Sequence, residues 1–276
     1  MGKVTQYSKP HALLWNGTSQ SCIDLNPVSG FSASAAYATD GAHQVGYGQD
    51  SLTNGNYEAL MWNSSASDYV NLNPSGMSYS VAYGISGNHQ FGYGYGPVSG
   101  WQEHALLWSG TAENCIDLNP AGYLESYGHG ICGNQQVGFG KISMGDGLHA
   151  LLWSGTAESY VDLHPGGIYE DSAALATNGI QQVGYGEVSD IDFRHALVWN
   201  GSTDNFKDLH HFLPQGFYQS EAFSIDNFGN VTGYATDNTG YTHAILWKPV
   251  PEPMTICLFS FGALLIRKRK YSTYYS

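Results

Sequence analysis

The chain has 276 residues, of which 35 are Gly and 38 are aromatic, while only 12% are charged and the formal net charge is −13. This aromatic content excludes a disordered acidic tail, and the lack of Gly at every third position excludes collagen. Ten basic residues against 23 acidic ones argue against a nucleic-acid partner, because phosphate binding needs clustered Lys and Arg.

The first ten residues, MGKVTQYSKP, form a short segment before the first repeated motif. A secretory signal peptide needs an apolar core of about seven to fifteen residues, and residues 1–10 contain none. For a protein that is exported, we therefore expect either a misplaced start codon or an N-terminus that lies further upstream.

A pentapeptide recurs six times along the chain and contains six of the seven Trp residues. Its copies are HALLW from His11, EALMW from Glu58, HALLW from His104, HALLW from His149, HALVW from His195 and HAILW from His243. Repetition at a fixed period of about 40 to 50 residues is typical of proteins built from repeated structural units.

Two further signatures follow the pentapeptide in register. The second reads CIDLNP from Cys22, YVNLNP from Tyr69, CIDLNP from Cys115, YVDLHP from Tyr160 and KDLHHFLP from Lys207. The third is typified by SAAYATDGAHQVGYG from Ser34 and returns from Ser80, Ser126, Ser172 and Ser220. Its large apolar residues alternate with Gly around a dipeptide such as Asp40-Gly41, which predicts two strands joined by a tight hairpin.

The repeated unit predicts an all-β fold. Four short strands in about 46 residues are typical of a four-stranded β-propeller blade, and no segment of the repeat shows a sustained helical period. Five full sets fit between residues 11 and 236, so we favour five blades within a repeat domain at residues 11–248. Six blades are the alternative if a strand pair precedes His11, and an open solenoid of β-hairpins is another.

Polar residues that recur in the repeat are interpreted as structural. One His per unit would be dispersed around a propeller, so we expect these side chains to bond neighbouring turns and expect no metal site; they are His11, His104, His149, His195 and His243. The recurring acids are expected to accept hydrogen bonds from backbone donors; they are Asp24, Asp117, Asp162 and Asp208. We expect no catalytic residue and no cofactor, with Ca²⁺ held by acidic loops as an open alternative.

The four cysteines show no C-x-x-C spacing. Neither a zinc site nor a redox dithiol is therefore indicated, and we interpret Cys22, Cys115 and Cys132 as structural thiols.

Several aromatic residues fall outside the repeated pattern and are expected in loops. Aromatic side chains on loops suit stacking against sugars or another protein. The candidates for ligand stacking are Tyr57, Tyr95, Trp101, Tyr123, Tyr169 and Tyr218.

From His11 to Trp247 the repeat resembles the bacterial extracellular HAF repeat family. That family combines a His-Ala-hydrophobic-hydrophobic-Trp strand, an Asp-Leu strand and a Gly-containing hairpin. Leu or Ile replaces the Phe of the family name here, as in His104-Ala105-Leu106, and the hairpin from Ala222 to Gly233 follows the family pattern most closely. The resemblance implies an exported bacterial protein.

The tail at residues 249–276 differs in kind from the body. Residues 1–249 carry 22 acidic and six basic side chains, whereas the tail ends in a basic cluster, Arg267-Lys268-Arg269-Lys270. The uncharged stretch from Met254 to Ile266 predicts a short hydrophobic helix of about 20 Å, less than the roughly 30 Å of a bilayer core. The basic cluster is expected to stay on the cytoplasmic side of the membrane as a stop to export.

The order of these parts resembles the PEP-CTERM sorting signal, with Pro251-Glu252-Pro253 preceding the apolar stretch and the basic cluster. The resemblance implies that an exosortase-type enzyme recognises the Pro-Glu-Pro segment, removes the tail and passes the protein to the cell surface or extracellular matrix. Until that step the tail would hold the protein at the membrane. An ordinary C-terminal membrane anchor is the alternative.

Together these features predict a non-enzymatic surface or matrix protein with a binding or structural role. Expected partners are the sorting enzyme and, outside the cell, exopolysaccharide or other envelope proteins. A lectin-like propeller that binds carbohydrate is the alternative. A propeller hydrolase or lyase is less favoured, because no acidic residue or His is singled out from the repeat.

Overall fold

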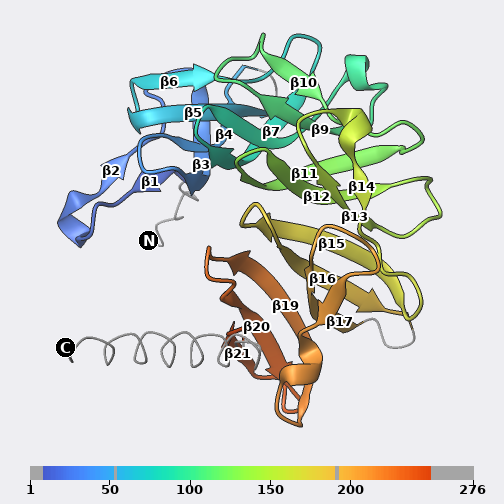
Figure 1. Ribbon diagram of the computed structural model, residues 1–276. Coiled ribbons are helices and arrows are strands. Elements are labelled where there is room, and N and C mark those ends of the chain that lie inside the picture. The colour runs from blue at the N-terminus through green and yellow to red at the C-terminus, as the bar shows by residue number, and fades with distance from the viewer. Residues whose placement is uncertain (1–8, 53–54, 190–192, 250–276) are drawn as a thin grey trace, which may run out of the picture.

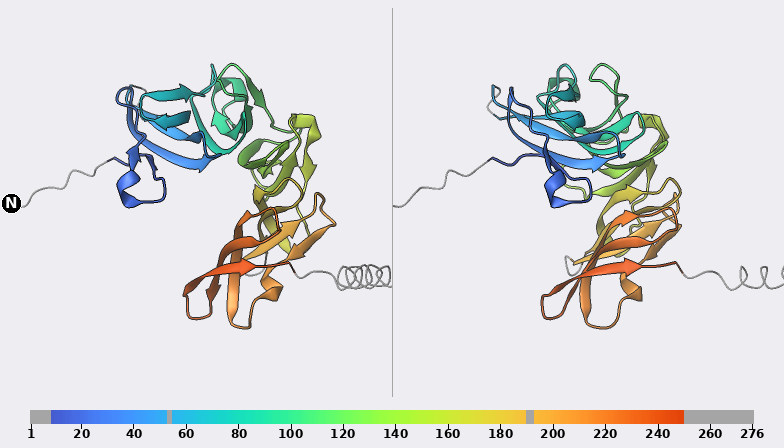
Figure 2. Two further views of the ribbon diagram at one scale, coloured as in Figure 1. Left: turned by 60° about the vertical axis from the view of Figure 1, so that its left-hand side comes forward. Right: turned by 90° about the vertical axis from the view of Figure 1, so that its left-hand side faces the viewer.

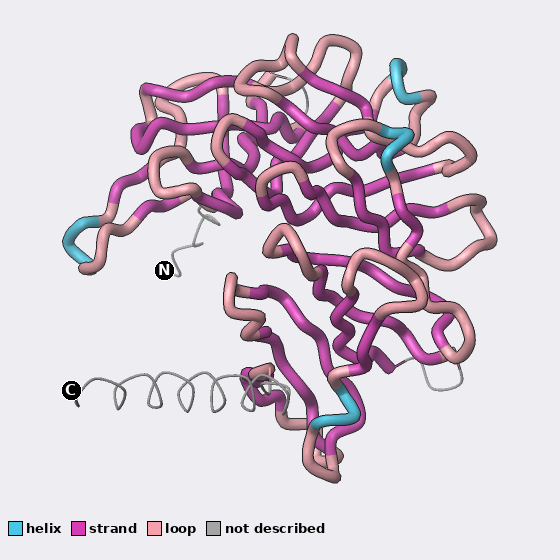
Figure 3. The backbone as a smooth tube through the Cα atoms, in the orientation of Figure 1, coloured by secondary structure: helices cyan, strands magenta, loops and turns pink. Residues whose placement is uncertain are grey.

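The computed structural model describes residues 9–52, 55–189 and 193–249. The described chain is built of antiparallel β-sheets, and its helical content is limited to four single turns of 3₁₀ helix, η1 (Ser19–Ser21), η2 (Pro97–Ser99), η3 (Ala157–Ser159) and η4 (His210–Phe212) (Figure 3). In this part of the chain no helix has the length and apolar character needed to cross a membrane. The expected C-terminal helix lies outside the described residues.

Four sheets have four strands each, ordered as they occur in the chain. The first two sheets contain β3 (Phe31–Thr39), β4 (Gln44–Asp50), β5 (Tyr57–Ser65) and β6 (Asp68–Asn71), then β7 (Tyr79–Ser86), β8 (His89–Tyr95), β9 (Glu103–Trp108) and β10 (Cys115–Asp117). The next two contain β11 (Glu125–Cys132), β12 (Gln135–Lys141), β13 (His149–Trp153) and β14 (Val161–Asp162), then β15 (Tyr169–Thr177), β16 (Gln182–Val188), β17 (Phe193–Trp199) and β18 (Phe206–Asp208).

Two smaller sheets stand at the ends of the array. The N-terminal sheet pairs β1 (Leu13–Leu14) with β2 (Ile23–Asp24), and the C-terminal sheet contains β19 (Phe217–Ile225), β20 (Val231–Asp237) and β21 (Thr242–Trp247). The six sheets follow one another along an arc whose two ends carry these smaller sheets (Figures 1 and 2). Each complete sheet begins at the third sequence signature rather than at the pentapeptide, and the five-blade count is not confirmed.

A bulge recurs at the same place in five sheets. It interrupts the register between the first two strands, for example between Ala36 and Ala38 in β3 and between Ala174 and Ala176 in β15. The opposite residue is always Gly, and an added Cβ would lie 1.8 to 1.9 Å from a carbonyl oxygen of the first strand at Gly46, Gly92, Gly138, Gly184 and Gly233. The recurring Gly is therefore needed because the two backbones approach too closely for any side chain.

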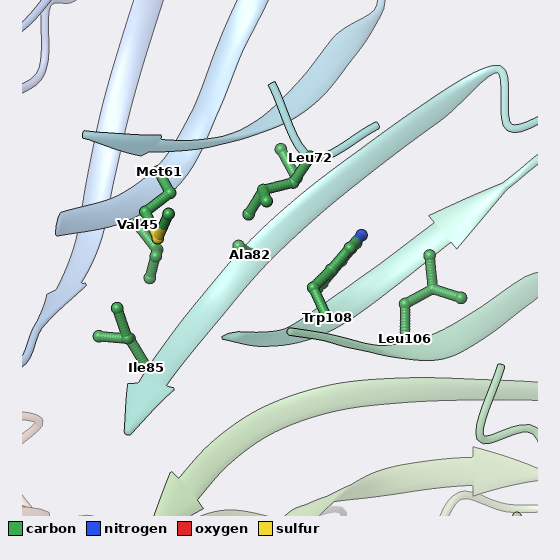
Figure 4. Packing of buried hydrophobic residues seen from close by; sticks show 8 residues of the cluster. Val45, Met61, Leu72, Ala82, Ile85, Leu106 and Trp108 are labelled. Atoms are coloured by element: carbon green, nitrogen blue, oxygen red, sulfur yellow. The ribbon is translucent and has the colours of Figure 1, made fainter. Parts of the chain in front are cut away.

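The core lies between successive sheets, and the repeated Trp fills it. Trp62, Trp108, Trp153 and Trp199 are completely buried. In Figure 4, Trp108 and Leu106 share a cluster with Ala82, Met61 and Val45, from strands of the first two complete sheets, and with Leu72, which directly follows β6. Removal of this apolar surface from water is the main stabilising contribution to the contact between sheets.

A buried Ser joins each sheet to the one before it. The Oγ atoms accept hydrogen bonds of 2.9 to 3.1 Å from the pentapeptide Ala N–H groups, which pair Ser34 with Ala12, Ser80 with Ala59, Ser126 with Ala105, Ser172 with Ala150 and Ser220 with Ala196. The Ser34 hydroxyl also donates to Asn26 Oδ1 at 2.8 Å. His164 replaces this Asn in a later unit and bonds Ser172 at 2.9 Å. These bonds satisfy polar groups that would otherwise be costly to bury.

Candidate functional site

The six aromatic candidates lie mostly in strands, so the expected loop location is wrong for four of them. Tyr57 begins β5, Tyr95 ends β8, Tyr169 begins β15 and Tyr218 lies in β19, whereas Trp101 and Tyr123 lie outside strands. The strands are longer than the repeated sequence signatures that predicted them. The four residues lie in these extensions, so the signatures alone placed them in loops.

Three of the candidates, Tyr57, Tyr95 and Trp101, each lie against another aromatic ring. The rings of Tyr95 and Trp101 are 5.6 Å apart, and Tyr95 stacks on Tyr79 of β7 at 5.3 Å. Tyr57 lies 4.4 Å from Tyr47, also measured between ring centroids. These residues belong to the first two complete sheets.

The other three candidates pack within the array. The Tyr123 hydroxyl donates to Asp162 Oδ2 at 3.0 Å, and the buried Tyr169 donates to Asp208 Oδ2 at 2.8 Å. Tyr218 packs against Phe193 at 4.6 Å. Their partners show that these side chains serve contacts between or within sheets.

A pocket of about 310 Å³ opens between the first two complete sheets, and we call it the tyrosine pocket. It is lined by Gly55, Asn56, Tyr57, Tyr79, Val81 and Tyr93. Only Tyr57 was among the expected binding residues. Tyr79 and Tyr93 were missed, because Tyr93 lies within the repeated third signature rather than outside it and Tyr79 directly precedes that signature.

Two hydroxyls of the tyrosine pocket, those of Tyr79 and Tyr93, remain protonated at neutral pH. The Tyr79 hydroxyl donates to Glu103 Oε1 at 2.6 Å. Burial raises the pKa of Tyr79 far above its ordinary value, and the adjacent Glu103 carboxylate raises it further. Burial also raises the pKa of Tyr93. The site therefore combines aromatic ring faces with neutral hydroxyl donors and one nearby carboxylate.

An aromatic stack continues from this region across three sheets. Tyr37 stacks on Tyr83 at 4.7 Å, and Tyr83 stacks on His129 at 4.9 Å. The three residues occupy one position of the third signature, beside the bulge, so alignment of the repeats does identify the stack in retrospect. Leu175 and Phe223 hold the same position in later units.

His129 makes this stack sensitive to acid. Burial lowers the pKa of His129 to about 4 from its ordinary value of 6.5, so the unfolded chain binds the proton more readily. Stability is therefore lost as pH falls from about 6.5 to 4, by up to about 3 kcal/mol at roughly 1.4 kcal/mol per pKa unit. We expect His129→Tyr, which restores the residue of the first two units, to remove this loss in denaturant titrations at pH 7, 5 and 4. Equal acid sensitivity in both proteins would contradict this role.

The recurring His and Asp residues pair with each other. His Nδ1 lies 2.6 to 2.8 Å from an Asp oxygen in the pairs His11–Asp24, His104–Asp117, His149–Asp162 and His195–Asp208. The second Asp oxygen accepts a backbone N–H two residues on, as expected, at Asn26, Asn119, His164 and His210. The expectation that the His side chains bond neighbouring turns is thus wrong for these four, since their partner is a carboxylate in the adjacent strand or at its end.

Hydrogen bonds from these His residues help to lower the pKa of two of the paired carboxyl groups, Asp162 and Asp208. Burial acts to raise the pKa of Asp162 and Asp208, but the bonds and charge of His149 and His195, together with hydrogen bonds from Tyr123 and Tyr169, hold both pKa values below the ordinary range. In the second unit Glu58 and Asn71 replace the pair and bond each other at 2.6 Å. This substitution keeps the bond between strands without an imidazole, which favours a structural role for the position.

Among residues 9–52, 55–189 and 193–249, no group of three or more His, Cys, Asp or Glu side chains is placed to hold a metal ion. Cys22, Cys115 and Cys132 are free thiols, and burial, with a contribution from Asp117, raises the pKa of Cys115 to about 12. The residues expected to direct sorting and to stop export, Pro251 to Pro253 and Arg267 to Lys270, lie outside the described residues.

Comparison with known proteins identifies the class of fold. No family model and no curated protein matches the chain. Among solved structures, the chain is similar to "The structure of putative TolB from Agrobacterium tumefaciens", with a TM-score of 0.53, 12% identity, and coverage of 87% of this chain and 90% of that one. At this identity the likeness shows the fold alone, which is all-β and propeller-like.

Proposed function

We propose that the protein is a non-enzymatic bacterial surface or matrix protein whose propeller-like repeat presents a carbohydrate-binding site. Two sequence features support export: the resemblance of the repeat to extracellular HAF repeats and that of the tail to a PEP-CTERM signal. In this proposal an exosortase-type enzyme recognises Pro251 to Pro253, and the basic cluster from Arg267 stops export until the tail is removed.

The tyrosine pocket is the observation that supports binding. Tyr57, Tyr79 and Tyr93 offer ring faces and hydroxyl groups, and Glu103 lies within hydrogen-bond distance of the Tyr79 hydroxyl. A sugar ring presents an apolar face of C–H groups and a rim of hydroxyls, so it can stack on a Tyr while its hydroxyls exchange hydrogen bonds. A volume of about 310 Å³ is at the lower end for small-ligand pockets and suits a short saccharide segment.

The lining favours binding over catalysis. Its six residues include no carboxylate pair, His, Ser or Cys that could act as acid, base or nucleophile. The nearby Glu103 carboxylate is occupied as the acceptor of a hydrogen bond from the Tyr79 hydroxyl.

The net charge favours a neutral ligand. With a formal charge of −13, the protein repels acidic polysaccharides over distances comparable to the Debye length, about 8 Å at physiological salt. We therefore propose a neutral segment of an exopolysaccharide as the ligand.

Glycan-array binding tests the site. We expect the wild-type protein to bind neutral bacterial glycans and Tyr57→Ala to bind them about tenfold more weakly, because one stacking ring is lost. Tyr241→Ala is the matched control, since Tyr241 is an exposed Tyr in the turn between β20 and β21, away from the pocket. Binding to no glycan, or equal binding by wild type and Tyr57→Ala, would refute the assignment.

A further inference from the structure

The contact between successive sheets follows one rule along the whole array. The second and fourth residues of a pentapeptide face the next sheet, and the third and fifth face the preceding one. Ala59 and Met61 of β5 thus share a cluster with Leu106 and Trp108 of β9. Equivalent residues meet in the other four clusters.

The N-terminal sheet exposes one half of this contact. The third and fifth positions of its pentapeptide are Leu13 and Trp15, which are 40% and 53% exposed, and we call them the N face. Their equivalents in the four complete sheets, such as Leu60 and Trp62, are at most 1% exposed. The second position, Ala12, is buried against the next sheet as the rule requires.

The C-terminal sheet exposes the other half. The second and fourth positions of its pentapeptide are Ala244 and Leu246, which we call the C face; both are exposed, Leu246 by 53%. The equivalents of Leu246 are at most 9% exposed in the complete sheets. The fifth position, Trp247, is buried, and its Nε1 donates to the Leu209 carbonyl at 3.0 Å.

We propose that the N face of one copy of this protein packs against the C face of a second copy, head to tail. The two faces carry the residue types that already pack together at the five internal contacts. Such a contact joins different surfaces of the two copies, so it leaves one free face of each kind and can extend to rings or filaments.

The exposure of Thr232 in β20 supports a partner sheet that contains only the two outer strands of a complete sheet, as the N-terminal sheet does. In the complete sheets this position of the second strand is Val45, Phe91, Val137 or Val183, and all four are fully buried. In the first complete sheet the residues that cover it include Ala82 and Ile85, from the first strand of the next sheet. The N-terminal sheet has only the strands equivalent to β5 and β6, so it would leave this position uncovered, and the C-terminal sheet has an exposed Thr there.

A second copy fits the arrangement better than the same chain does. The N-terminal and C-terminal sheets lie at opposite ends of the arc and are held there by four packed sheets between them (Figures 1 and 2). The contact involves few residues, so we expect weak association, with a Kd between about 1 μM and 1 mM. Salt should strengthen it by screening the acidic surfaces.

Analytical ultracentrifugation of the full chain in a non-ionic detergent tests the proposal. We expect the average mass of the wild type to rise with concentration above the chain mass of 29.9 kDa. Trp15→Glu and Leu246→Lys should each remain monomeric, whereas Trp101→Glu, which changes a Trp of similar exposure away from both faces, should associate as the wild type does.

Mixing the two face variants gives the decisive result. Trp15→Glu retains the C face and Leu246→Lys retains the N face, so an equimolar mixture should form a dimer of twice the chain mass and nothing larger. A monomeric wild type at all concentrations would overturn the proposal in favour of closure within one chain. Association of either variant alone, or no dimer in the mixture, would overturn it in favour of a symmetric contact or another occupant.

Discussion

Replacing Gly184 by Ala is expected to lower the free energy of unfolding by about 3 kcal/mol or more, or to prevent folding. An added Cβ would lie 1.9 Å from the Ala173 carbonyl oxygen and 3.0 Å or less from two further backbone atoms. Because these atoms belong to the paired strand, relief requires separation of β15 from β16 and loss of their hydrogen bonds. Denaturant titration followed by far-UV circular dichroism measures the change.

Gly145→Ala is the matched control for this prediction. Gly145 has no heavy atom within 4 Å of an added Cβ and does not need a left-handed backbone, so the substitution should change stability by less than about 0.5 kcal/mol. Similar stability of Gly184→Ala and Gly145→Ala would show that the backbone of the bulge is not as close as described.

Replacing Trp153 by Ala is expected to cost about 3 to 5 kcal/mol of unfolding free energy. The side chain is completely buried between two sheets, where its ring lies 5.8 Å from that of Phe91 and shares a cluster with Leu107 and Leu118. Truncation removes most of this apolar contact and leaves a cavity. The same denaturant titration detects the loss.

Trp101→Ala is the control, because Trp101 lies in an exposed turn. It should change stability by less than about 0.5 kcal/mol. If the two Trp substitutions had equal effects, the repeated Trp would not be the centre of the contact between sheets.

Much of the fold could be predicted from the repeat. The pentapeptide and the Gly-containing hairpin identified the strands, and Asp40-Gly41 and Asn178-Gly179 do join first and second strands of a sheet. The sequence did not show which signature begins a sheet, because that depends on which successive strands hydrogen-bond to each other and which instead belong to separate sheets. The reason for Gly46 and its equivalents was also hidden, since the bulge opposite them arises from the paired strand.

The site was less predictable than the fold. Tyr57 was identified because it departs from the repeat, but Tyr79 and Tyr93 come from other strands and reach the pocket only once two sheets pack. For four of the five recurring His residues the partner lies thirteen residues further along the chain in an adjacent strand, as for His104 and Asp117, whereas His243 bonds Asp237, six residues before it. Sequence spacing of this kind acquires meaning only when the register of the two strands is known.

The exposed N and C faces could be seen only in the structure. Leu13 and Leu246 belong to copies of the same repeated pentapeptide as their buried equivalents, and nothing in the amino-acid sequence distinguishes the exposed copies from the buried ones. Their exposure follows from the position of their sheets at the ends of the arc.

The proposal that this protein works outside the cell is tested most directly by its location and by its C-terminus. A tagged full-length chain would be expressed in a bacterium that has an exosortase-type enzyme, the cells fractionated, and the C-terminus of the recovered protein identified by mass spectrometry. We predict protein at the cell surface or in the matrix that lacks the basic cluster from Arg267 to Lys270. Protein found only in the cytosol, with that cluster still attached, would contradict the proposed function.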